Sequence, residues 1–141
     1  MLKFMVDNKP KFEVIVLGII FDPKKKKILI GRRENDPYIQ NLDWCFPGGR
    51  LNMGEDVDQS LKKKMKLKTG YAIKNLGTIF SDTRPERPSL VELYFLTEVF
   101  EGKEKPGNDI LELRWISPKE IDQYFKISMH RKLKEFLNDL V

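Results

Sequence analysis

The segment GRLNMGEDVDQSLKKKMKLKTGY, residues 49–71, decides the fold of this 141-residue chain. Its apolar positions recur every four residues, at Val57, Leu61 and Met65. That spacing places them on one face of a helix. Acidic residues lead the segment, lysines end it and Gly70 follows directly, an order that suits the helix dipole and a glycine C-cap. The segment therefore predicts a helix from Glu55 to Thr69.

Three apolar runs precede this helix, and each is short enough and rich enough in strand-forming residues to be a strand. They are residues 12–21, 27–31 and 43–46. A stretch with Pro23 and four lysines separates the first two runs, so we expect a β-hairpin there. The third run leads into Pro47, Gly48 and Gly49, which predict a tight turn.

Further strands and helices are expected after the helix. The strands are predicted at residues 71–80, 89–100 and 110–116, separated by the loop SDTRPERP and a second loop at 102–108. Ser117 followed by Pro118 is typical of a helix start, and an apolar stripe predicts a last helix at about 130–140. This order favours an α/β fold in which a mixed β-sheet is sandwiched between α-helices.

Length and composition restrict the organisation of the chain. A chain of 141 residues with 40% hydrophobic residues is expected to form one core, so we predict a single domain over residues 1–141. The net charge of +5 favours anionic partners, although a mixed charged surface is also typical of soluble proteins. The longest apolar run is too short to cross a membrane, and the only cysteine is Cys45. A cytoplasmic protein without membrane partners is therefore expected.

The spacing within residues 49–71 resembles the Nudix box. In that motif a glycine, five residues, a glutamate and seven residues precede Arg-Glu-aliphatic-x-Glu-Glu-x-Gly-aliphatic. The matching positions are Gly49, Glu55, Met65, Gly70 and Tyr71. The stretches GRRENDPYIQNLDWCFPGGR and LRWISPKEI also look like family segments, so the resemblance covers nearly the whole chain. It implies a Nudix fold, a nucleoside diphosphate derivative as ligand and a homodimer.

The chain departs from this motif at the positions of the family's metal-binding glutamates. Lys64, Leu67 and Lys68 stand there, and their spacing places them on one helix face. Ammonium groups repel magnesium, so we expect no metal site or cofactor, and weak or lost magnesium-dependent hydrolysis. The two lysines are instead expected to bind phosphate, unless they simply form a solvated face. Lys63 replaces the family's arginine and is expected to pair with Glu55.

Within the superfamily, the chain most resembles the GDP-mannose mannosyl hydrolases. The shared features are Arg32 and Arg33, the turn at residues 46–50 and a helical C-terminal tail. The resemblance implies that Arg50 contacts a phosphate and that the ligand is a nucleotide sugar such as GDP-mannose. It also implies a catalytic histidine a few residues before Arg114, where this chain has none.

The candidate site residues form two groups. The expected ligand-binding residues are Arg32, Arg33, Gly48, Gly49, Arg50, Lys64, Lys68, Arg84 and Arg87. The last two lie in a predicted loop at the sheet edge, where phosphate contacts are expected, and the alternative for them is a role in solubility. If the protein is an active hydrolase, the substitute base and metal ligands are Glu55, Asp109 and Glu112, with magnesium as cofactor, and Asp56 and Asp58 are further candidates.

Other chemically notable side chains are expected to be structural. Cys45 and Trp44 lie in an apolar run and are predicted to be core residues, although Trp44 or Tyr38 is an alternative platform for a base. His130 is predicted to have a structural role at a helix start. Three functions remain open: a binding module with weak or lost hydrolysis, a hydrolase with substitute ligands, and an RNA-binding or scaffold protein. The last has least support, because basic residues are not interleaved with aromatic ones, so nucleic acid is not an expected partner.

Overall fold

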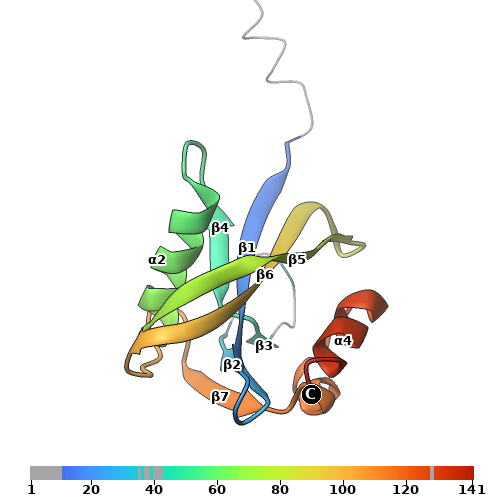
Figure 1. Cartoon of the computed structure of the whole chain (residues 1–141). Coiled ribbons are helices and arrows are strands. Elements are labelled where there is room, and N and C mark those ends of the chain that lie inside the picture. Colours follow the sequence, from blue (N-terminus) through green and yellow to red (C-terminus); the bar gives the residue numbers. More distant parts are fainter. Residues whose placement is uncertain (1–10, 35, 37–38, 40–42, 128) are drawn as a thin grey trace, which may run out of the picture.

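A mixed sheet carries the fold of the computed structural model, which describes residues 11–34, 36, 39, 43–127 and 129–141 (Figure 1). Within these residues seven strands join in the order β3-β2-β1-β6-β5, with β4 paired to β1 and β7 paired to β2. The strands are β1 (Glu13–Asp22), β2 (Lys27–Arg32), β3 (Trp44–Cys45), β4 (Gly48–Leu51), β5 (Tyr71–Arg84), β6 (Arg87–Gly102) and β7 (Glu112–Ile116).

Strand β1 makes the sheet mixed. It runs antiparallel to β4, with Val16 opposite Gly49, and parallel to β6, with Val16 opposite Leu93. Its C-terminal end pairs antiparallel with β2, which forms the predicted hairpin. The mixed α/β sheet expected from the order of apolar runs is therefore confirmed.

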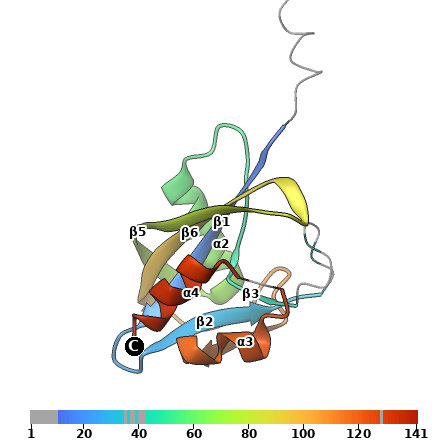
Figure 2. The same cartoon turned by 90° about the vertical axis from the view of Figure 1, so that its right-hand side faces the viewer.

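Alternate side chains of β1 enter two different cores. Val16 and Ile20 are fully buried with Leu61 and Met65 of α2 (Val57–Thr69). Side chains two apart on a strand share a face, so Ile19 points the other way. It packs in the core that contains Leu133 and Leu137 of α4 (Arg131–Asn138). Helices thus cover both faces of the sheet, as Figures 1 and 2 show.

The ends of α2 follow from its caps. The Asp56 side chain accepts a hydrogen bond of 2.9 Å from the backbone N–H of Gln59, so the helix begins at Val57, two residues later than predicted. Gly70 ends the helix with φ of 82°, and its N–H bonds to the carbonyl of Lys66. A Cβ at position 70 would also clash with the carbonyl oxygen of Lys103. Glycine is therefore required both by the positive φ and by this close approach.

The C-terminal helices begin where the sequence predicts. Ser117 and Glu120 form a capping box around the 3-10 turn Pro118–Glu120, which continues into α3 (Ile121–Tyr124). The His130 side chain accepts a hydrogen bond of 3.1 Å from the N–H of Lys132 and so caps α4. Its predicted structural role is confirmed. Among the described residues, none of the helices combines the length and apolar character needed to span a bilayer.

Two segments predicted as loops are strand instead. The turn expected at Gly48 and Gly49 is instead the start of β4. Because glycine has no side chain, β4 can approach β1 closely at these two positions. A Cβ on Gly48 would clash with the carbonyl oxygen of Val16. The expected loop at residues 81–88 is mostly strand, since β5 continues to Arg84 and β6 begins at Arg87. Ion pairs from both arginines into the sheet favour this extension.

Candidate functional site

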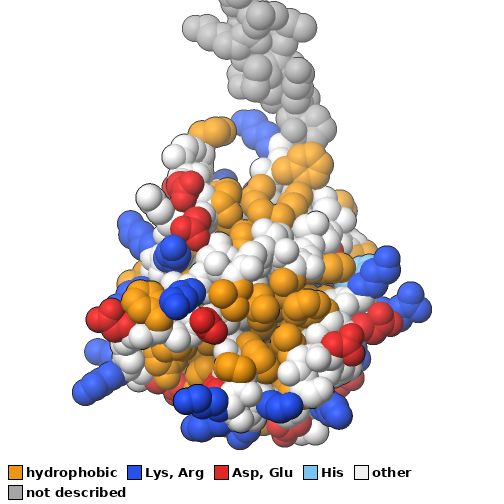
Figure 3. Space-filling view, in the orientation of Figure 1, with side chains coloured by type: hydrophobic (Ala, Val, Ile, Leu, Met, Phe, Trp, Pro, Cys, Tyr) orange, Lys and Arg blue, Asp and Glu red, His pale blue; other side chains and the backbone are white. Residues whose placement is uncertain are grey.

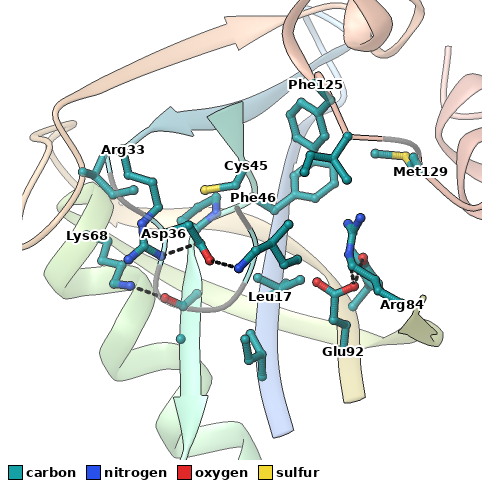
Figure 4. A pocket seen from close by; sticks show the side chains of 18 residues that line it. Leu17, Arg33, Asp36, Cys45, Phe46, Lys68, Arg84, Glu92, Phe125 and Met129 are labelled. Atoms are coloured by element: carbon teal, nitrogen blue, oxygen red, sulfur yellow. Dashed lines mark hydrogen bonds and ion pairs between the residues drawn. The ribbon is translucent and has the colours of Figure 1, made fainter. Parts of the chain in front are cut away.

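A pocket of about 700 Å³, including its open mouth, lies beside β1 and β4 (Figure 4). Charged residues line two separate parts of it. Arg33, Asp36 and Lys68 lie at one end, and Arg84 and Glu92 lie at the other (Figure 4). The wall between them is largely apolar and includes Leu17, Phe46, Tyr94, Phe125 and Met129. Few polar groups within an apolar cavity are typical of small-molecule sites.

Two lysines of α2 approach β4, and of these two Lys68 lines the first end of the pocket whereas Lys64 does not. Lys68 is only 7% exposed, and its Nζ donates a hydrogen bond to the carbonyl oxygen of Gly48. Lys64, one turn earlier, donates to the hydroxyl of Ser60 over 2.8 Å. A Cβ on Gly49 would lie 3.0 Å from Cε of Lys64 and 3.5 Å from Nζ of Lys68. The missing side chain of Gly49 therefore leaves room for both lysines. Because Lys68 is buried, it does not belong to a solvated helix face.

A chain of ion pairs links this end of the pocket to the loop before β7. Asp109 contributes one oxygen to Arg33, with Oδ2 and Nη2 2.5 Å apart, and the other to Lys68, with Oδ1 and Nζ 3.2 Å apart. Arg33 also meets Asp36 over 3.2 Å. The four side chains carry two positive and two negative charges, so each cation already has a carboxylate partner within the protein.

Glu55 stabilises the turn before α2. Its carboxylate accepts a hydrogen bond of 2.6 Å from the backbone N–H of Asn52, and this contact chiefly lowers its pKa. The nearest cation is Lys64, with Nζ 3.9 Å from Oε1. Lys63 is exposed. The expected pair between Glu55 and Lys63 is therefore wrong, because Lys64 is the lysine that faces Glu55. The rotation of α2 places position 64, rather than 63, on the side of the helix that faces Glu55.

Arg32 and Glu112 lie in a separate cluster on β2 and β7. Glu112 meets Arg32 over 3.2 Å and Arg114 over 2.6 Å, and bonds from Arg114 and then Arg32 lower its pKa. Arg114 in turn lies over the rings of Trp44 and Tyr124, 5.1 and 5.5 Å from their centroids. Neither Arg32 nor Glu112 is among the residues that line the pocket.

The remaining candidate arginines are spread over three places. Arg50 is exposed on β4, opposite Ile15 of β1. Arg84 lines the pocket and meets Glu92 over 2.7 Å. Arg87 meets Glu13 over 2.8 Å at the start of β6.

The carboxylates near the pocket do not fit a resident magnesium ion. Glu55 faces Lys64, Asp109 faces Arg33 and Lys68, and Glu112 faces Arg32 and Arg114, so each carboxylate already has a cation of the protein as its partner. No group of three His, Cys, Asp or Glu side chains suited to a metal occurs in the part of the chain that the structure describes. Magnesium needs several oxygen ligands around one point, and the two lysines of α2 stand where the resemblance places the family's carboxylates.

The side chains predicted to be structural are packed accordingly. Trp44 contacts Tyr124 edge to face, with ring centroids 5.4 Å apart. Cys45 borders the pocket, but burial raises the pKa of its thiol to about 12, so it is a poor nucleophile. Tyr38 lies outside the described residues.

Sequence reasoning missed the polar group at the second end of the pocket. Glu92 is 4% exposed and interrupts the apolar run of β6. An acid inside the otherwise apolar stretch 90–96 is the signal that would have drawn attention to it, because buried carboxylates need partners. The partners are Arg84 and the hydroxyl of Tyr94, which donates to Glu92 over 3.2 Å.

Positive charge is not gathered on one side of the face shown in Figure 3. Lys and Arg side chains lie around its border with acidic ones between them, and apolar side chains occupy much of its middle. This face therefore does not favour binding of nucleic acid, which needs a continuous basic surface.

Comparisons with known proteins agree with the fold. An ADP-ribose pyrophosphatase of Methanocaldococcus jannaschii is 35% identical over 104 residues, which is 70% of this chain, and the chain spans 58% of that relative. A putative 8-oxo-dGTP diphosphatase of Bacillus subtilis is 25% identical over 89% of this chain and 77% of its own length. Neither relative bears the name of a GDP-mannose hydrolase, so the finer subfamily resemblance is not supported.

Solved structures and a family model complete the comparison. A MutT structure from a study of Aliivibrio salmonicida and Vibrio cholerae superposes with a TM-score of 0.74 at 20% identity, covering 93% of this chain and 100% of that one. A NUDIX hydrolase of Nitrosomonas europaea gives 0.75 at 21%, covering 94% and 73%. The model of the NUDIX domain matches residues 11–140. The chain therefore belongs to the NUDIX family.

Proposed function

We propose that this protein binds a nucleoside diphosphate derivative and that its magnesium-dependent hydrolysis is weak or lost. The observation that carries the proposal is the position of Lys68, whose buried amine lies between the carbonyl of Gly48 and the carboxylate of Asp109. A diphosphate carries the negative charge that such an amine attracts. A metal ion there would be repelled by it.

The diphosphate is proposed to lie against the start of β4. Lys64 and Lys68 flank Gly49, and Arg33 borders the same end of the pocket. Together they bring three positive charges, of which two are balanced by Asp109 and Asp36, while the third, on Lys64, faces Glu55 over 3.9 Å. Binding of a diphosphate would therefore weaken the ion pairs of Arg33 and Lys68 with these carboxylates. The free energy lost from those ion pairs would lower the affinity for the diphosphate.

The apolar part of the pocket supports a nucleoside rather than a bare phosphate. Phe46 and Phe125 pack with ring centroids 5.0 Å apart and border the space beyond the lysines. Aromatic side chains stack favourably on bases. An ADP-ribose or a guanosine nucleotide contains both parts that the pocket would need to bind.

Calorimetry in the presence of EDTA tests the proposal. We expect ADP, GDP and inorganic pyrophosphate to bind with affinities that magnesium changes less than twofold. Lys68→Met should weaken binding of all three about tenfold, because a charge-assisted contact is lost. Lys63→Met on the exposed side of α2 is the matched control and should bind like the wild type. Binding that disappears without metal would overturn the proposal.

Hydrolysis is the second candidate function, favoured by the name and 35% identity of the Methanocaldococcus jannaschii relative. On this view the protein cleaves an ADP-ribose-like compound with magnesium held by Glu55, Asp109 or Glu112. The test is release of AMP from ADP-ribose with and without magnesium. Turnover that stops in Glu55→Gln, while that variant remains folded, would establish the second function over the first.

A further inference from the structure

The carboxylate of Asp109 lies between the two cations at the first end of the pocket. One oxygen, Oδ2, is 2.5 Å from Nη2 of Arg33, and the other, Oδ1, is 3.2 Å from Nζ of Lys68. Arg33 and Lys68 both line the pocket, at the same end of it in Figure 4. These two cations therefore surround an anion that the protein itself supplies.

Asp109 satisfies the two cations incompletely. Within the described ranges, its Oδ1 is buried without a hydrogen-bond partner, so its contact with Lys68 is an ion pair that lacks hydrogen-bond geometry. Nε of Arg33 is likewise buried and has no hydrogen-bond partner there. Buried polar atoms without such partners lower stability. A phosphate group has more acceptor oxygens than a carboxylate and can bind the same donors more fully.

The loop that carries Asp109, between β6 and β7, is also attached to the end of α2. The backbone N–H of Gly107 donates to the carbonyl oxygen of Lys68 over 3.1 Å, and the N–H of Lys105 donates to that of Thr69 over 2.9 Å. Lys68 is therefore held by this loop twice, at its carbonyl by Gly107 and at its amine by Asp109. A ligand that takes the amine removes one of these two attachments.

Two anchors limit the part of the loop that can move. Glu104 accepts a hydrogen bond of 2.6 Å from Nε1 of Trp115, and Ile110 is buried. Residues 105–109 lie between these anchors and bury no apolar side chain. Segments with few buried apolar contacts open locally at a low cost in free energy. The ion pairs of Asp109 are therefore a large part of what holds this segment against α2.

We propose that Asp109 is an internal substitute for the phosphate of the ligand, and that a bound diphosphate displaces it and releases residues 105–109 from the end of α2. This inference rests on the proposed function. Arg33 also meets Asp36, so a diphosphate that entered while Asp109 stayed in place would be repelled by two carboxylates. Exchange of one anion for another avoids this repulsion. Once Asp109 leaves, the hydrogen bonds from Lys105 and Gly107 open more often.

Hydrogen exchange of single amides, followed by NMR in EDTA, tests the inference on the unaltered protein. We expect the amides of Lys105 and Gly107 to exchange about tenfold faster when the protein is saturated with inorganic pyrophosphate. A ligand that only stabilises the folded state slows exchange, so acceleration is specific to release of the segment. The amide of Lys26, which bonds to Asp22 in the β1–β2 turn, is the internal control and should not accelerate. Unchanged or slower exchange of Lys105 and Gly107, with pyrophosphate bound, would overturn the inference.

Failure of this inference is distinguishable from failure of the proposed function. Calorimetry on the same samples shows whether pyrophosphate and ADP bind. Binding without faster exchange leaves the proposed function standing and removes the role given to Asp109. If neither ligand binds, the proposed function is overturned and this inference falls with it.

Asp109→Asn provides a second test. Asparagine keeps the size of the side chain and removes its charge, so the segment should be released without a ligand. The amide of Gly107 should then exchange about tenfold faster than in the wild type, and pyrophosphate should change its rate by less than about twofold. Asp122→Asn, at an exposed position of α3, is the matched control and should behave like the wild type.

The outcome for this variant decides against the inference in one case. A folded Asp109→Asn protein whose Gly107 amide exchanges as slowly as in the wild type, and still accelerates tenfold with pyrophosphate, would overturn it. The exchange measurement on the wild type decides alone if the variant does not fold.

Discussion

Lys68 of α2 and Asp109 of the loop before β7 form an ion pair, with Nζ and Oδ1 3.2 Å apart. The resemblance to the Nudix box implies a metal-binding glutamate at position 68, and here an amine faces a carboxylate from another part of the chain. The pair therefore joins the two segments without a metal ion. Exchanging its charges is the most direct way to examine this end of the pocket.

Returning the three box glutamates should create a metal-dependent protein. Lys64→Glu, Leu67→Glu and Lys68→Glu together would place acidic side chains near Asp109, where their repulsion lowers stability without a cation. Magnesium should then raise the melting temperature by about 5 °C, because it binds only the folded state. Differential scanning calorimetry with magnesium and with EDTA measures this shift.

The matched control for that variant carries the same charge change on the exposed side of α2. It combines Lys62→Glu, Lys63→Glu and Lys66→Gln, all at exposed positions, so that each variant changes the net charge by about −5. Its melting temperature should respond to magnesium no more than that of the wild type. A wild type that itself gains several degrees with magnesium, or that hydrolyses nucleotides as fast as the glutamate variant, would show that a metal site exists elsewhere.

Asp109→Asn should strengthen the binding of inorganic pyrophosphate. The change removes the carboxylate that Arg33 and Lys68 share, so Lys68 loses its carboxylate partner and Arg33 keeps only Asp36, which leaves more positive charge for an added anion. We expect an affinity a few-fold higher by calorimetry, together with a lower melting temperature. Asp122→Asn on α3 is the control and should leave the affinity unchanged. Weaker binding in Asp109→Asn would mean that Asp109 positions the cations rather than competing with the ligand.

Asp82 should make stability fall as pH rises. Its pKa is raised to about 7 in the folded protein, chiefly by burial, whereas an unfolded aspartate titrates near about 4. Between these values the folded state keeps a proton that the unfolded state has lost, so the free energy of unfolding decreases from about pH 4 to about pH 7. Asp82→Asn should therefore be more stable than the wild type at pH 8 by about 1 kcal/mol, a value reduced for solvent screening, and similar to it at pH 4.

Urea unfolding at several pH values measures this difference. Asp58→Asn provides a contrast of opposite sign, because a hydrogen bond from Asn75 and the contact with Lys62 lower the pKa of Asp58. That variant should lose stability relative to the wild type at neutral pH and recover as the pH falls through the folded pKa. A stability difference for Asp82→Asn that is independent of pH would contradict the prediction.

Gly70→Ala should destabilise the protein more than Gly54→Ala. Both glycines have φ of 82°, so alanine is strained by about 1 kcal/mol at either position. At position 54 an added Cβ has no neighbour within 4 Å, whereas at position 70 it meets the carbonyl of Lys103 and the N–H of Lys105. The difference between the two variants in urea unfolding isolates this clash. Equal losses would show that the 103–105 segment moves freely to accept a side chain.

The sequence by itself determined the elements and the family. The helix that ends at Gly70, the capped start at Ser117 and the apolar strands depend on residues only a few positions apart, so periodicity and cap chemistry predict them. The spacing of Gly49, Glu55 and Gly70 was equally readable, and it led to the Nudix fold. Boundaries were missed where tertiary contacts extend a strand, as at Gly48 and Arg84.

Only the tertiary structure decided which charges meet. Lys68 contacts Gly48 and Asp109, which are 20 and 41 positions away in the sequence. Arg84 contacts Glu92 across the β5–β6 hairpin, whose turn region the sequence predicted as a loop. Sheet register and helix rotation set these distances, and a shift of one residue exchanges Lys63 for Lys64 beside Glu55. The pocket therefore combines residues that no local sequence pattern connects. Its two ends are built from strands and helices that come together only when the cores on both faces of β1 pack.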